Sequence, residues 1–145
     1  MIKKYLIICL TFFLFSNISL AENVTVFNFT EEEVKPYFSE DKVLMGAFDV
    51  ANKLFDIHIV EREDLPKYRE NIRSFEVKND QEETIGIFYT DYTLRPNKGG
   101  GAWMNTFRSQ SKFDGNVIPL VVNVCNFPPE NEDGVILLSF EQVET

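Results

Sequence analysis

The sequence predicts a small α+β domain, with one amphipathic helix near the N-terminal end and a small, mainly antiparallel sheet after it. Residues 40–55 carry apolar side chains at helical spacing. From residue 56 onward, short runs of β-branched and aromatic residues alternate with polar turns. The 145 residues, 44% hydrophobic and 26% charged, suit one globular unit, and no repeat or linker divides residues 22–145.

Residues 1–21 are predicted to be a secretory signal peptide rather than part of the fold. Lys3 and Lys4 precede an apolar run over residues 5–15, and Ser19 to Ala21 supply the short cleavage region. The run is about half of the ~20 residues that a membrane-crossing helix needs. We therefore expect cleavage after Ala21, export to the periplasm and no stable membrane span. An uncleaved N-terminal anchor helix is the alternative.

The helix over residues 40–55 has the clearest local signals, after residues 22–38, which we expect to form an entry loop with a short helical turn. Ser39 suits the N-cap, and Glu40 and Asp41 place negative charge in the first turn. The apolar face is wide enough to be buried on more than one side, which indicates a larger neighbour. It comprises Val43, Leu44, Ala47, Phe48, Val50, Ala51, Leu54 and Phe55.

Strands are predicted over residues 57–60, 74–77 and 84–92, with a polar hairpin turn at 79–83 and a loop at 95–101. Trp103, Met104 and Phe107 then follow at near-helical spacing and are interpreted as packing residues. The run over residues 117–127 is the longest β-branched stretch, and Pro119 within it predicts an edge strand.

Residues 139–142 (SFEQ) form a capping box, the sequence mark of a helix N-terminus. Only three residues follow Gln142, and so short a helix is not stable alone. We interpret this pattern as a chain that stops where a helix begins.

The residues show no catalytic equipment. The net charge of -9 disfavours nucleic acid as a partner, because phosphate binding needs clustered Lys and Arg. One His and, after signal cleavage, one Cys argue against a tetrahedral zinc site in this chain. His58 is interpreted as a half-buried strand residue rather than as the partner of a nucleophilic Cys125. The triplet Gly99 to Gly101 lacks the spacing of a phosphate loop and is interpreted as a turn.

Four segments nevertheless resemble bacterial peptidyl-dipeptidases of the thimet oligopeptidase and oligopeptidase A family of zinc metallopeptidases. They cover residues 31–55, 88–104, 119–127 and 137–145, and GGAWM and NVCNF are the most specific motifs. Gly99 departs from the family, which commonly has a basic residue there. The resemblance implies a fragment of a larger, mostly helical catalytic domain, in which residues 22–145 end just before the zinc-binding HExxH helix.

The same resemblance implies that short peptides are the substrates and that the strand before the zinc helix borders the active site. A peptide could pair with that strand by β-addition, so the expected substrate-binding residues are Val121, Val122, Asn123, Val124 and Cys125. No catalytic or metal-binding residue is expected in this chain, and zinc, the cofactor of the intact family, is not expected to bind it alone.

The sequence therefore predicts a partial zinc metallopeptidase that is inactive alone. Two alternatives stay open. One is a split peptidase, whose zinc-binding half is a separate chain. The other is an exported peptide-binding or interaction protein that lost catalysis.

Overall fold

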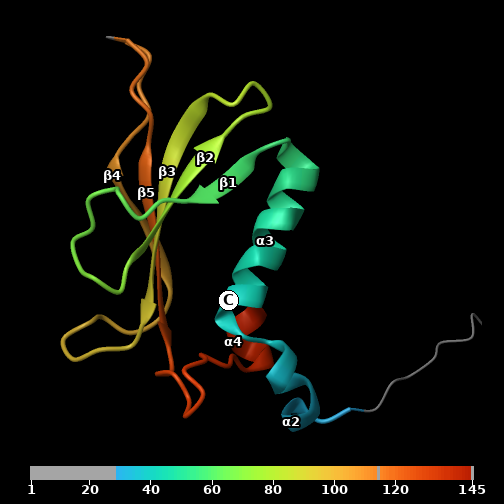
Figure 1. Cartoon of the computed structure of the whole chain (residues 1–145). Helices are drawn as coiled ribbons and strands as arrows, with labels where there is room; N and C mark the ends of the chain where they lie inside the picture. The colour runs from blue at the N-terminus through green and yellow to red at the C-terminus, as the bar shows by residue number, and fades with distance from the viewer. Residues whose placement is uncertain (1–28, 114, 145) are drawn as a thin grey trace, which may run out of the picture.

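The computed structural model describes residues 29–113 and 115–144, so the predicted signal peptide lies outside the described residues. Figure 1 shows one sheet with helix α3 along one face and the short helices α2 and α4 beside the N-terminal half of α3. The elements are α2 (Glu31–Val34), the 3-10 turn η1 (Lys35–Tyr37), α3 (Glu40–Phe55), β1 (His58–Glu61), β2 (Arg73–Lys78), β3 (Thr84–Thr93), β4 (Trp103–Arg108), β5 (Leu120–Phe127) and α4 (Phe140–Glu144). The α+β prediction is confirmed. None of the described helices has the length and apolarity to cross a membrane.

The five strands are arranged in the order β1-β2-β3-β5-β4. The β1/β2, β2/β3 and β4/β5 pairs are antiparallel, and β3 and β5 are parallel. The predicted edge position of β5 is therefore wrong, because β5 lies between β3 and β4. Pro119 precedes the first residue of β5, so its missing N–H removes no bond from the ladder. Its carbonyl accepts a hydrogen bond from the Ile87 amide at 3.0 Å.

The residues predicted to pack at near-helical spacing form strand β4. The packing prediction is confirmed for Phe107, whose ring lies 5.7 Å from that of Tyr68 and 6.1 Å from that of Tyr89. Trp103, Met104 and Phe107 lie on this edge strand, whose six residues are all exposed. Near-helical spacing over six residues does not distinguish a helix from a strand. Antiparallel pairing with β5 decides the conformation.

Helix α3 has the predicted bounds and N-cap: the Ser39 hydroxyl accepts a hydrogen bond from the Lys42 amide at 3.4 Å. The helix packs on the sheet through Phe48, whose ring lies 5.0 Å from that of Phe75 and 6.3 Å from that of Phe88. Leu44 is its only buried residue among those that the structure describes. The remainder of the wide apolar face is half-buried or exposed.

Two apolar clusters complete the core. Ile72, Ile87, Tyr89, Val122 and Val124 pack on the sheet face opposite α3, with Leu65, Ile118 and Leu120 against them. Cys125, Phe127 and Leu138 form the second cluster, which Val143 of α4 covers. The predicted capping box of α4 is confirmed by hydrogen bonds from the Gln142 amide to the Ser139 hydroxyl (3.2 Å) and from the Ser139 amide to Gln142 Oε1 (2.9 Å).

Candidate functional site

Strand β4 presents a free edge. Its inner side pairs with β5, and among the described residues no strand pairs with its outer side. The Thr106 amide donates to the Asn105 side-chain oxygen at 2.8 Å, so this N–H is occupied only by a neighbouring side chain. Trp103, Met104 and Phe107 are 39%, 69% and 57% exposed. An edge of this kind can accept an extended chain as an additional strand.

A glycine loop leads into β4, and Asn126 of β5 holds it. Asn126 Nδ2 donates to the carbonyl oxygens of Gly99 (2.9 Å) and Gly101 (2.8 Å). Gly101 has a φ of 83°, a left-handed conformation that favours glycine. Asn126 Oδ1 is buried and has no donor among the described residues. It borders a cavity of about 230 Å³ that Gly101, Ala102, Cys125, Phe127 and Gln142 also line.

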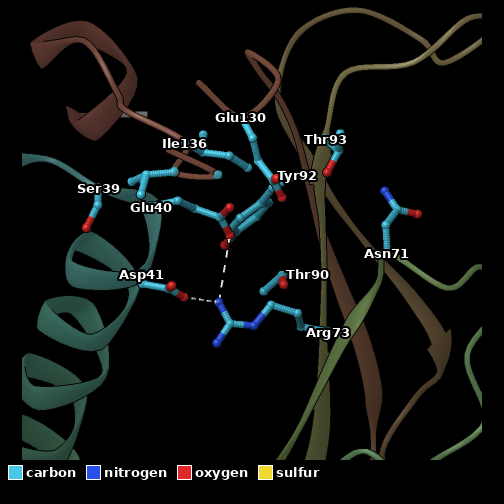
Figure 2. Close-up of a pocket in the computed structure, with 12 residues that line it drawn as sticks. Ser39, Glu40, Asp41, Asn71, Arg73, Thr90, Tyr92, Thr93, Glu130 and Ile136 are labelled. Atoms are coloured by element: carbon cyan, nitrogen blue, oxygen red, sulfur yellow. Dashed lines mark hydrogen bonds and ion pairs between the residues drawn. The ribbon is translucent and has the colours of Figure 1, made fainter. Parts of the chain in front are cut away.

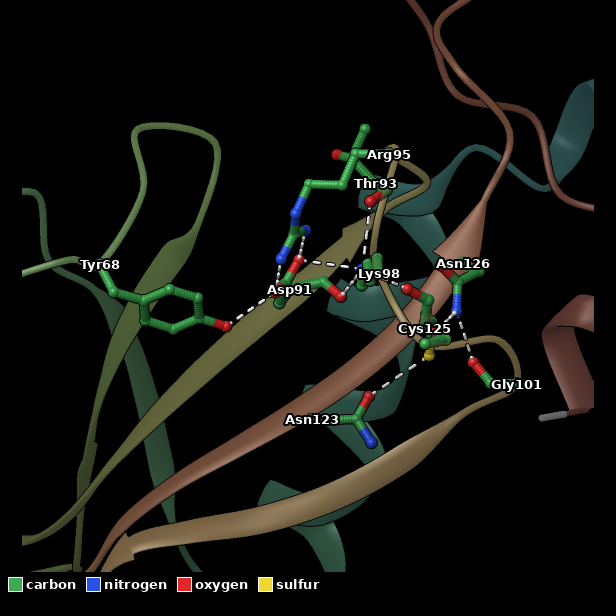
Figure 3. A network of polar contacts seen from close by, with 10 residues as sticks. Tyr68, Asp91, Thr93, Arg95, Lys98, Gly101, Asn123, Cys125 and Asn126 are labelled. Atoms are coloured by element: carbon green, nitrogen blue, oxygen red, sulfur yellow. Dashed lines mark hydrogen bonds and ion pairs between the residues drawn. The ribbon is translucent and has the colours of Figure 1, made fainter.

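The loop begins at a buried cluster of charged residues, shown in Figure 3. The Asp91 carboxylate accepts hydrogen bonds from Arg95 (2.5 and 2.7 Å), from Lys98 (2.9 Å) and from the Tyr68 hydroxyl (2.8 Å). The side chains of Lys98 and Asp91 are only 2% and 3% exposed.

Ionisation in this cluster follows from its hydrogen bonds. Burial alone raises the pKa of Asp91, but the bonds from Arg95, Lys98 and Tyr68 outweigh it and hold that pKa well below its usual range. Burial and the bond to Asp91 raise the pKa of Tyr68 to about 12. The cluster therefore stays charged at neutral pH.

A second polar region is a cavity of about 530 Å³ between the start of α3, the sheet and residues 130–136 (Figure 2). Arg73 lies beside it and makes ion pairs with Asp41 (2.5 Å), Glu61 (2.8 Å) and, at 4.0 Å, Glu40. Burial raises the pKa of Glu40, although Arg73 opposes this. Because Arg73 connects α3 to β1 and β2, we interpret these ion pairs as contacts that stabilise the fold.

The predicted substrate-binding residues Val121 to Cys125 all lie in β5. The backbone of Val121 to Val124 pairs with β3 on one side and β4 on the other, so this part of β5 has no free edge for a peptide. The Cys125 carbonyl accepts a hydrogen bond from Lys98 Nζ. Val122, Val124 and Cys125 are buried, and Val121 and Asn123 are half-buried. Their role in binding a peptide stays a prediction. The sequence feature that could have identified the neighbouring edge strand, β4, is the aromatic segment that follows Gly99 to Gly101.

The Cys125 and His58 side chains are far apart. His58 is on β1 and Cys125 on β5, three strand spacings or about 14 Å apart across the sheet, and the register displaces them along the strands as well. The prediction that His58 is half-buried is wrong, because it starts an edge strand and is exposed.

No group of three or more His, Cys, Asp or Glu within residues 29–113 and 115–144 is placed to hold a metal ion. These residues therefore do not fit a zinc site.

Comparison with known proteins gives a consistent result. The family model of Peptidase family M3 matches residues 18–145. Dipeptidyl carboxypeptidase of Escherichia coli is 39% identical over 114 residues, which cover 77% of this chain and 17% of that protein. Oligopeptidase A of Haemophilus influenzae is 32% identical over 117 residues, which cover 79% of this chain and 17% of that protein. The matched part of the chain thus spans about a sixth of the length of these relatives.

Proposed function

Because the chain belongs to Peptidase family M3, we propose that it binds short peptides in extended form along the free edge of β4. The family supports a peptidase-like function, and relatives are named dipeptidyl carboxypeptidase and oligopeptidase A. That short peptides are the ligands of this chain is part of the proposal.

The observation that carries the proposal is the free side of β4. Backbone N–H and C=O groups at a sheet edge can bond to an added strand whatever its side chains are, which suits a peptidase that accepts many short sequences. The exposed Trp103, Met104 and Phe107 supply apolar contacts for alternate side chains of the peptide. Strand β5 pairs with the inner side of β4. We propose that residues 121–125 support the binding edge in this way.

Hydrolysis is a separate question. An HExxH zinc site needs two histidines, and the sequence contains one. We therefore propose that the 145-residue chain binds peptides without cleaving them and holds no stoichiometric zinc. A second chain with the zinc-binding half stays a prediction.

The binding proposal is tested with the single tryptophan, Trp103, which lies on β4 itself. Titration with short blocked peptides should change Trp103 emission, and amide hydrogen exchange should slow in Trp103–Arg108 but not in His58–Glu61. Thr106→Pro removes an outward N–H and should abolish binding. Ile59→Pro, which removes an outward N–H on the opposite edge strand β1, is the matched control and should leave binding intact.

Protection of β1 instead of β4, or undiminished binding by folded Thr106→Pro protein, would contradict the proposal. The same preparations test catalysis. Hydrolysis of a blocked tetrapeptide that a chelator stops, and that Thr106→Pro protein lacks, would show that the chain is active. Hydrolysis that persists equally in the variant would indicate a contaminating peptidase.

Export is proposed from the predicted signal peptide alone. The secreted protein should begin at Glu22, as N-terminal sequencing of periplasmic material would show. An intact Met1 on membrane-associated protein would indicate an anchor instead. If export and peptide binding both hold while catalysis is absent, the exported binding protein is the better description.

A further inference from the structure

We propose that Lys98 and Asn126 are positioning residues, which hold the two ends of the glycine loop and so fix the register in which β4 meets a peptide. This inference rests on the proposed peptide-binding edge.

Lys98 holds the start of the loop. Its Nζ lies within hydrogen-bonding distance of four oxygens: the Asp91 carbonyl (2.7 Å), Asp91 Oδ1 (2.9 Å), the Thr93 carbonyl (3.1 Å) and the Cys125 carbonyl (2.5 Å). An ammonium has three donors, so every proton is used. The acceptors come from β3, where Asp91 and Thr93 lie, and from β5. Lys98 therefore joins the loop to both β3 and β5.

Asn126 holds the other end of the loop. It donates to the carbonyls of Gly99 and Gly101, and β4 begins two residues after Gly101. Its partners are loop backbone atoms, while Asn126 itself belongs to β5. Figure 3 shows both attachments on neighbouring parts of β5, at Cys125 and Asn126.

These attachments matter because three consecutive glycines place little restriction on the backbone. A Cβ added at Gly100 or Gly101 would meet nothing within 4 Å, so packing does not confine this part of the loop. Slippage of β4 by one residue would exchange the faces to which its side chains point. Side-chain hydrogen bonds at both ends thus oppose movement that the loop sequence itself permits.

The test uses the full chain with Lys98→Met and Asn126→Ala. We expect faster amide exchange in residues 99–108 without peptide, a shifted Trp103 emission, and an increase in peptide Kd of about tenfold, equivalent to 1.4 kcal/mol. Arg73→Met is the matched control, because it also breaks a multiply bonded cation but lies three strands from β4. It should lower Tm while leaving exchange in 99–108 and the peptide Kd near wild type.

Wild-type exchange rates in 99–108 of Asn126→Ala protein would overturn the inference, whether or not Lys98→Met folds. Equal acceleration in Arg73→Met would also overturn it, because the effect would then follow general stability. If the wild-type chain binds no peptide, the proposed function fails. The rates of amide hydrogen exchange measured without peptide would still decide whether Lys98 and Asn126 hold the edge of β4 in place.

Discussion

At the residue scale, the most unusual feature is the group of charges buried beside the glycine loop. Lys98, Asp91 and Arg95 form ion pairs in which the first two side chains are almost completely buried. Removing one partner from such a group leaves the others as uncompensated buried charge, which is far more costly than losing an exposed pair.

We predict that Asp91→Asn lowers the free energy of unfolding by about 3–5 kcal/mol at neutral pH. The carboxylate has a depressed pKa in the folded protein. Its contribution is therefore complete above its unfolded pKa near 3.9 and declines as the pH falls below that value toward the folded pKa. Urea unfolding at pH 7 and at about pH 3 measures both effects.

The control for this prediction is Asp64→Asn, which removes an exposed partner of Arg62. Its unfolding curve at pH 7 should almost match that of the wild type. Equal curves for Asp91→Asn and wild type at pH 7 would show that the buried cluster contributes no net stability.

A second residue-scale prediction concerns Cys125. Burial raises the pKa of its thiol, although Lys98 opposes this, so little thiolate is present at neutral pH. Iodoacetamide should modify Cys125 much more slowly in the native chain than in concentrated urea, as mass spectrometry of its tryptic peptide would show. Phe113→Cys provides a reactive comparison, because position 113 is 93% exposed. Equally rapid modification at both positions would contradict the burial of Cys125.

At the scale of single elements, local signals mark both ends of α3. Ser39 caps its first turn, and Asp56 ends it with a left-handed φ of 52° while its amide bonds to the Asn52 carbonyl. Both are local signals. By contrast, β4 is specified by its neighbour, because its conformation depends on pairing with β5.

We predict that Ser39→Ala lowers the free energy of unfolding by about 1 kcal/mol, because the Lys42 amide loses its acceptor. Ser39→Asp retains an acceptor and should stay close to the wild type. Thermal unfolding followed by circular dichroism distinguishes them. An equal loss in both variants would mean that the hydroxyl matters through a contact other than the cap.

At the scale of the whole molecule, much apolar surface faces solvent. On α3, Met45, Val50, Leu54 and Phe55 are 46%, 54%, 67% and 69% exposed. Each large apolar side chain that stays in water forgoes about 1.5–3 kcal/mol of burial energy. Because net stability is commonly only about 5–15 kcal/mol, such losses are significant.

We therefore predict a marginally stable chain that binds a fluorescent reporter of apolar surface below its melting temperature and aggregates as its concentration rises. The double variant Leu54→Lys and Phe55→Lys should bind less dye with little change in Tm, because both side chains are exposed. Phe48→Ala should instead lower Tm, since Phe48 packs on Phe75 and Phe88. A monomer with a sharp, high-temperature transition and no dye binding would indicate a self-sufficient domain.

Much of the fold was predictable because its signals are local. The bounds of α3, the 79–83 turn, the first three strands and the capping box at residues 139–142 each depend on neighbouring residues in sequence, and the structure has all of them. The candidate site was less predictable. Residues 121–125 were selected as an edge, but the edge strands of the described sheet are β1 and β4, the second of which lies next to these residues. Asp91, Arg95 and Lys98 are close in sequence. The cluster was nevertheless missed, because its burial depends on contacts with Tyr68 and with the Cys125 carbonyl, which are 23 and 27 positions away.

By itself, the sequence determined the class of fold, the long helix and membership of Peptidase family M3, because apolar spacing, caps and motifs are properties of contiguous residues. The tertiary structure alone decided the strand order, the burial of Lys98 against Asp91 and the position of the free edge. Strand pairing joins segments distant in sequence, as when β3 and β5 pair across a loop that contains β4. Which backbone groups stay unpaired, and so which edge can meet a peptide, is settled only when all the strands are in place.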